Sequence, residues 1–126
     1  MAYLTPQQIA EIVDARRLRK AVFVTALDKE MDAVRAHLEH LGSVVGRDEA
    51  IYECGVFPDP AGDWLIVVVE TGAGNHEAQS RVTNAYVTLG PFELQVFTGV
   101  GGSRKSDVPL GSVVAGSWVY TPYPGK

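Results

Sequence analysis

The sequence has a single cysteine, no long apolar run and little excess charge. Cys54 alone cannot form a disulfide framework within the chain, and this favours a reducing compartment, so we expect a cytoplasmic protein. No apolar run approaches the roughly 18 residues of a membrane-spanning helix, and no secretory signal opens the sequence, so neither a membrane nor secretion is expected. The 126 residues carry a formal net charge of −4, which argues against nucleic acid and anionic lipid as partners.

The only basic run is RRLRK at residues 16–20. We expect it at the C-terminal end of a helix, where cations interact favourably with the helix macrodipole. Thr5 is a typical N-cap for that helix, with Pro6 at the first helical position and Gln8 completing a capping box. We therefore expect residues 1–20 to form an N-terminal helical extension.

A buried strand is predicted at residues 21–27 (AVFVTAL), which are apolar and rich in β-branched side chains. A helix over residues 28–41 is predicted to follow, because Asp28 can cap it and Gly42 can end it. Its apolar stripe consists of Met31, Val34, Leu38 and Leu41.

The remaining elements are predicted from apolar runs bounded by turn residues. Two strands, AIYECGVF and WLIVVVE, are joined by PDPAGD in a hairpin, and a helix over residues 76–89 ends at Gly90. ELQVFT and SVVAGSWVY, at residues 93–98 and 112–120, are the last predicted strands. Helices that alternate with apolar strands indicate an α/β sheet covered on both faces.

Three loops follow the predicted strands: TALDKE, ETGAGN and FTGVGG, at residues 25–30, 70–75 and 97–102. In open α/β sheets, ligands bind beyond the carboxyl ends of the strands. Glycine in two of these loops would let the backbone approach a ligand closely. The alternative, that these glycines only turn the chain, stays open at this point.

Two other motifs are weaker. GAGNHE at residues 72–77 follows a strand and opens a helix, as a dinucleotide fingerprint does, but Glu77 stands where a small residue is needed and would repel a pyrophosphate. His37 and His40 would share a face of the predicted helix. Since neither has the acid–histidine pattern of metal ligands, we interpret them as surface residues and expect no metal ion or cofactor.

Glu30 is the candidate catalytic residue. It falls in the first turn of a predicted helix, whose positive end favours the ionised carboxylate. A carboxylate on this loop, facing the glycine turns, is placed to bind a water molecule and take its proton. The alternative is a solvated first-turn glutamate with no chemical role.

Together these stretches resemble the nucleoside phosphorylase and nucleosidase superfamily, in particular its methylthioadenosine/S-adenosylhomocysteine nucleosidase branch. VFVTALDKEMDAV resembles the family's first strand and acidic turn, and VVVETGAGNHEAQ resembles its Gly-x-Gly turn and Ala-rich helix. VFTGVGG and PLGSVVAG resemble its Thr-Gly-x-x-Gly turn and the strand after it, and VYTPYPGK resembles a Tyr-rich segment of divergent members. The resemblance implies that residues 21–126 are the N-terminal part of a phosphorylase/hydrolase-like domain. The implied fold is a three-layer α/β fold, truncated here, with a central mixed sheet flanked by helices.

The resemblance also implies roles for single residues. Glu30 falls on the family's water-activating glutamate. The residues that would line the nucleoside site are Ala26, Gly72, Gly74, Val100, Gly101 and Gly102. Val100 departs from the serine that is common in the nucleosidase branch, so a hydroxyl contact there is lost.

The implied activity is hydrolysis of the N-glycosidic bond of an adenine nucleoside or nucleotide. In the family, a second acid and a ribose-binding Met-Glu pair lie in the C-terminal half, which these residues do not include. We therefore expect the 126-residue chain alone to be inactive and to act with fused C-terminal domains or as a homo-oligomer. The alternative hypothesis is a non-catalytic nucleotide-binding or assembly module of the same fold.

Overall fold

The computed structural model describes residues 3–47, 49–71, 75–100 and 104–116, with only the backbone described at residues 75–78. In these ranges the chain forms three helices and five strands in the order helix, strand, helix, three strands, helix, strand. They are α1 (Pro6–Arg16), β1 (Arg19–Thr25), α2 (Asp28–Arg35), β2 (Glu39–Val45), β3 (Ile51–Phe57), β4 (Trp64–Glu70), α3 (Asn75–Leu89) and β5 (Leu94–Phe97).

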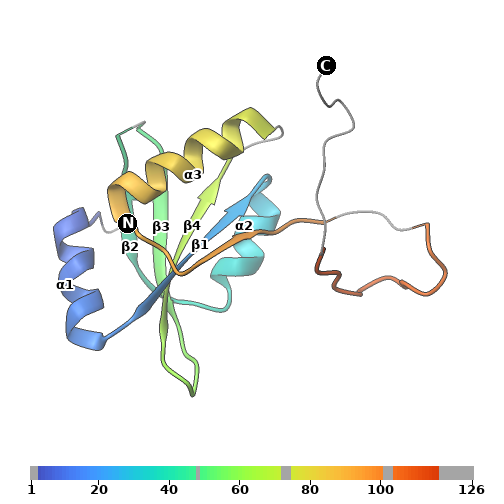
Figure 1. The fold of residues 1–126 in the computed structure, drawn as a ribbon, viewed down its shortest axis with the longest axis horizontal. Helices are drawn as coiled ribbons and strands as arrows, with labels where there is room; N and C mark the ends of the chain where they lie inside the picture. Colours follow the sequence, from blue (N-terminus) through green and yellow to red (C-terminus); the bar gives the residue numbers. More distant parts are fainter. Residues whose placement is uncertain (1–2, 48, 72–74, 101–103, 117–126) are drawn as a thin grey trace.

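The five strands form one mixed sheet in the order β2-β3-β4-β1-β5. β1 lies between β4 and β5 and is parallel to both, whereas β2, β3 and β4 are joined by antiparallel pairing. α1 and α3 cover one face of the sheet and α2 covers the other (Figure 1). The predicted α/β fold, with a central mixed sheet flanked by helices, is confirmed.

Burial on both faces explains why β1 and β4 are almost continuously apolar. Val22 and Val24 of β1 point into the larger core under α1 and α3. Ala21 packs with β4 side chains in the smaller core under α2, where the half-buried Phe23 also lies. A strand with helices over both faces has no solvent-facing side on which to place polar residues.

α1 begins as predicted. The Thr5 hydroxyl accepts a hydrogen bond from the Gln8 N–H at 3.1 Å, and the Gln8 side chain accepts one from the Thr5 N–H at 2.9 Å. The helix packs on the same core as α3, because Ile9 is only 2% exposed and belongs to that core. Leu4 extends the contact, with its N–H donating to the Ser43 carbonyl of β2 at 2.8 Å.

The basic run at residues 16–20 divides between two elements. Arg16 ends α1 and pairs with Glu39 of β2 at 3.3 Å, while Arg19 opens β1 and lies over the Trp64 ring at 4.1 Å. Lys20 donates a hydrogen bond to the Leu89 carbonyl at the end of α3 at 2.5 Å. These side chains therefore join α1 and β1 to neighbouring elements.

The helix predicted over residues 28–41 is wrong in its second half. α2 ends at Arg35, whose guanidinium pairs with Glu53 of β3, and β2 begins at Glu39. Leu38 packs over Gly55 of β3, where an added Cβ would lie only 2.8 Å from the Leu38 Cβ. Pairing with β3 therefore overrides the helical spacing of Leu38 and Leu41.

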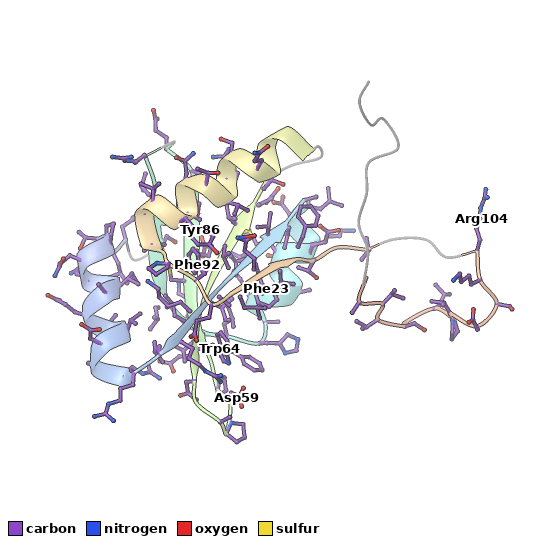
Figure 2. The ribbon with its side chains drawn as sticks, viewed as in Figure 1. Phe23, Asp59, Trp64, Tyr86, Phe92 and Arg104 are labelled. Carbon is purple, nitrogen blue, oxygen red and sulfur yellow. The ribbon has the colours of Figure 1, made fainter. Side chains whose placement is uncertain are left out.

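The later elements mostly agree with the sequence pattern. β3 and β4 form the predicted antiparallel hairpin, and α3 ends at the predicted place. The Tyr86 ring of α3 contacts Phe92 edge-on at 5.0 Å between centroids, which closes the core at this end of the helix (Figure 2). Of the strand predicted at residues 112–120, residues 112–116 are exposed and not in a strand, and the rest lies outside the described residues.

Cys54 lies in β3 and is 2% exposed. Burial, with a smaller effect from the Glu53 charge, raises the pKa of its thiol from 9.0 to about 12. Since the thiolate is the reactive form, Cys54 is a buried apolar residue and not a nucleophile. Within the described ranges, no helix combines the length and apolar character needed to cross a membrane.

Candidate functional site

The candidate site lies at the edge of the sheet where three parallel strands end. β1, β4 and β5 end at Thr25, Glu70 and Phe97, and because they are parallel their carboxyl ends share this edge. The points at which the three predicted loops leave the sheet therefore lie along one edge. Ala26, Glu30 and Val100 are described, whereas Gly72, Gly74, Gly101 and Gly102 lie outside the described residues.

Glu30 connects two of these loops. Its Oε1 accepts hydrogen bonds from the N–H groups of Ala26, at 3.0 Å, and Leu27, at 3.1 Å. Its Oε2 accepts one from the N–H of Val100, at 3.1 Å. Glu30 is the third residue of α2, so its side chain reaches back to the N-cap residue Leu27 as in half of a capping box. Three of the predicted site residues, Ala26, Glu30 and Val100, thus meet at one carboxylate.

Gly99 lies against the same carboxylate. A Cβ added to Gly99 would lie 3.1 Å from Oε2 of Glu30 and 3.5 Å from its Cδ. That separation is tighter than ordinary van der Waals contact, so a side chain here would press on the carboxylate. A residue larger than glycine here would require the Glu30 carboxylate to shift by a few tenths of an ångström.

The hydrogen bonds favour the ionised form of Glu30. The N–H groups of Val100 and then Ala26 hold the pKa of the carboxyl below its ordinary value of 4.5. Desolvation opposes them, and the N–H of Leu27 adds a weaker lowering effect. A carboxylate offers about four lone-pair directions. Donors among the described residues occupy three of them, which leaves one direction at Oε2 for a water molecule or a substrate hydroxyl.

A pocket of about 660 Å³ extends from this carboxylate along the α2 face of the sheet. Its lining is mostly apolar and includes Phe23, Val34, Leu38, Trp64, Ile66 and Leu94. The polar side chains that reach it are Glu30, Thr98 and His37. An apolar pocket with a few polar groups at one end is the usual form of a small-molecule site.

His37 and Thr98 at this pocket are additions to the residues predicted from the sequence. His37 and His40 are both exposed, as expected of surface residues, but they share no helix face, because His37 follows the end of α2 and His40 lies in β2. The sequence carries no signal for His37, because its place depends on where α2 stops. Thr98 directly follows β5 in the second glycine loop, so its position in that loop was the available signal.

Besides Glu30, a pair of carboxyl groups, those of Asp28 and Glu70, lies where β4 ends beside the N-terminus of α2. Glu70 is hydrogen-bonded to Asp28, and this bond is the main cause that raises the pKa of Glu70 above 4.5. Burial and the charges of Asp28 and Asp32 act in the same direction, whereas Arg35 opposes them. Among the residues that the structure describes, no group of three or more His, Cys, Asp or Glu side chains is arranged to hold a metal ion.

The two glutamates are expected to titrate on opposite sides of their ordinary value. Because Glu30 has a lowered pKa in the folded state, its contribution to stability is present above the unfolded pKa and is lost as the pH falls through the folded pKa. Because Glu70 has a raised pKa, its contribution is present below the unfolded pKa and is lost as the pH rises through the folded pKa. Carbon-detected NMR titration of the side-chain carboxyls measures both pKa values.

Asp28→Asn supplies the matched control for this titration. It removes the main cause of the Glu70 shift, so the pKa of Glu70 should fall, while the pKa of Glu30 should stay low because Asp28 is not among its causes. A pKa at or above 4.5 for Glu30 in the unmodified chain would contradict the three hydrogen bonds described here.

Comparison with known proteins identifies no family for this chain. No protein-family model, no curated protein and no solved structure matches the chain. The likeness to the nucleosidase branch therefore depends on the sequence motifs.

Proposed function

We propose that this chain carries the water-activating part of a purine nucleosidase, which hydrolyses the N-glycosidic bond of an adenine nucleoside or nucleotide. The observation that carries the proposal is the Glu30 carboxylate, which lies at the carboxyl edge of parallel strands and beside a pocket. The donors in the described part of the chain leave one Oε2 direction for water. The adenine specificity comes from the resemblance of the three loops to the nucleosidase branch.

In this reaction, water attacks the anomeric carbon as the bond to the base breaks through an oxocarbenium-like transition state. Glu30 would hold the water at Oε2 and take its proton as the C–O bond forms. The departing base has to be protonated by a second acid. We assign this role to none of the described residues. We therefore expect the 126-residue chain by itself to bind nucleoside without releasing base.

A second candidate function follows from the same hydrogen bonds. General bases work best with a pKa near the operating pH, whereas the three N–H donors hold the pKa of Glu30 below 4.5. This observation favours a non-catalytic module in which Glu30 fixes the Ala26 and Val100 loops around a bound nucleotide. Turnover by a longer form separates the two candidates.

The test is chromatography of adenosine, AMP and their 5′-thio analogues after incubation with the protein. We expect no adenine above the blank from the 126-residue chain, and we expect adenine release from a longer product of the same reading frame. NMR shifts of the Ala26 and Val100 amides should report nucleoside binding by the short chain. Binding without turnover by the longer form would favour the non-catalytic module, and the absence of both would contradict the proposal.

The same assay distinguishes hydrolysis from phosphorolysis. The phosphorylase branch grips phosphate with arginines, whereas here the first loop carries Asp28 and Glu30 and the second turn is preceded by Phe97. Arg104 lies away from the sheet (Figure 2), and ionised Glu30 would repel a phosphate dianion. With the longer product, we expect release of free ribose at an equal rate with and without millimolar phosphate. Strict dependence on phosphate, with ribose 1-phosphate as product, would transfer the chain to the phosphorylase branch.

A further inference from the structure

Glu53 is a buried acid on the face of the sheet that α2 covers. Its neighbours along β3, Tyr52 and Cys54, belong to the core under α1 and α3, so alternation turns Glu53 toward α2. Its side chain is only 9% exposed, and Val68, which is paired with it in β4, is apolar and fully buried. Carboxylates are almost never buried in such surroundings unless they are paired. The contacts of Glu53 therefore have to offset the cost of burying it.

Two groups hold the Glu53 carboxylate. The hydroxyl of Ser43, the buried residue paired with it in β2, donates a hydrogen bond to Oε2 at 3.1 Å. The guanidinium of Arg35, the last residue of α2, lies with Nη1 3.5 Å from Oε1. Arg35 also pairs with Asp32, one turn earlier in the helix, so its planar guanidinium bridges a helix residue and the sheet. Glu53 is thus the point at which the end of α2 is tied to β3.

The chain at the end of α2 has a second anchor on β3. Leu38, three residues after the helix ends, packs over Gly55, where an added Cβ would lie 2.8 Å from the Leu38 Cβ and 2.9 Å from the Glu39 carbonyl oxygen. Gly55 is two residues beyond Glu53 and therefore lies on the same face of the strand. Since α2 has only eight residues, or about two turns, a change at this end tilts the whole helix.

The N-terminal end of α2 carries Glu30, whose three hydrogen bonds depend on different parts of the fold. The bonds from Ala26 and Leu27 join residues four and three positions apart, so they move with the helix. The bond from Val100 comes from the turn after β5, 70 residues along the chain, and requires that α2 lie at the correct tilt over the sheet. The contact between Glu30 and Val100 is therefore the one most sensitive to the anchor at the other end of α2.

We propose that Glu53 is a positioning residue for the candidate site: through Arg35 it sets the tilt of α2 and so holds Glu30 against the N–H of Val100. An apolar residue would avoid the cost of burying a charge, and replacing a buried ion pair in this way is often neutral or stabilising. A carboxylate held by Ser43 at Oε2, in contrast, offers the guanidinium one defined place at Oε1. Orientation of α2 is therefore what the buried charge contributes.

Glu53→Gln tests the proposal in the 126-residue chain through the NMR titration of Glu30. The amide is close in size to the carboxylate but loses the charge that pairs with Arg35. We expect the pKa of Glu30 to rise toward its ordinary 4.5, because the hydrogen bond from Val100 is the largest cause that lowers it. Electrostatics alone gives the opposite sign, since removing a negative charge lowers the pKa of another carboxyl or leaves it unchanged. A fall, or no change, would overturn the proposal.

The amide protons of the same variant give an independent readout. The Val100 resonance should move upfield as its hydrogen bond to the carboxylate is lost. The resonances of Ala26 and Leu27 should stay in place, because their bonds to Glu30 are local to the start of α2. Similar shifts at all three amides would indicate a general loosening of the fold and would contradict positioning through the tilt of α2.

Arg35→Lys covers the case in which Glu53→Gln disturbs the fold. The Arg35 side chain is 41% exposed, and lysine keeps its charge but lacks the planar fork that bridges two acids. We expect the same rise in the pKa of Glu30, although the net charge is unchanged.

Glu39→Gln is the matched control, because it breaks a second pair between a strand glutamate and a helix arginine, that with Arg16 of α1. It should leave the titration of Glu30 and the Val100 resonance unchanged, and shifts as large as those of Glu53→Gln would overturn the proposal. The role of Glu53 rests on the proposed function in that Glu30 activates water, but neither readout uses turnover. The absence of base release by a longer form would therefore contradict the nucleosidase activity without altering these shifts.

Discussion

Replacing Leu65 with alanine is expected to lower the free energy of unfolding by about 2–5 kcal/mol. Leu65 lies in β4, is fully buried, and packs in the core between the sheet and the helices α1 and α3. Truncation removes apolar contacts and leaves a cavity that a strand hydrogen-bonded on both sides cannot collapse to fill. The loss would be a large part of the roughly 5–15 kcal/mol that stabilises a typical domain.

Leu110→Ala is the matched control, because it makes the same chemical change at a fully exposed side chain. Its effect should stay within about 0.5 kcal/mol. Urea unfolding followed by circular dichroism measures both variants, and for Leu65→Ala the midpoint should fall with an unchanged slope. Equal midpoints for the two variants would show that β4 is not part of the cooperative core.

Glu30→Gln is expected to lower kcat by a factor of about 10² or more in a form of the protein that turns over. The amide cannot accept the proton of the attacking water. It also replaces one carboxylate oxygen with a donor group, so the Oε1 contacts to Ala26 and Leu27 can be kept only if the new NH2 faces the N–H of Val100. Two donors then face each other, and the turn after β5 should loosen.

The split between kcat and KM separates these two effects. If Glu30 acts on the water, kcat falls while KM changes little, and Glu11→Gln, an exposed position on α1, changes neither. If Glu30 only fixes the loops, KM rises and kcat at saturation is largely kept. If Glu30→Gln turns over at the rate of the unmodified protein, Glu30 has no catalytic role and only caps the helix.

The sequence predicts best those elements that are decided locally. The first helix is specified by Thr5, Pro6 and Gln8 within one turn. The strand predicted at residues 21–27 from its apolar run is present, with bounds two residues earlier at Arg19–Thr25. The error over residues 36–41 has a different cause. Leu38 and Leu41 fit the helical period as well as they fit β2, and only pairing with β3, which comes later in the chain, decides between them.

The same distinction holds for the candidate site. The place of Glu30 at a strand-to-helix turn follows from local pattern, and the structure brings it to Ala26 and Val100 as the parallel strands require. The carboxyl pair of Asp28 and Glu70 could not be predicted, because it depends on β4 lying next to β1. The parallel neighbours of a strand are set by the whole topology, which residue patterns do not record.

The place of β1 between two later strands has a consequence for how the protein is made. Both strands that flank it, β4 and β5, are synthesised after it, the second of them more than sixty residues later. During translation β1 must therefore wait with both edges unpaired, while the β3–β4 hairpin can form from neighbouring residues alone. Closure of such distant contacts slows folding relative to local ones. The emerging chain should therefore depend on the hairpin as its template, with β1 docking onto a preformed edge.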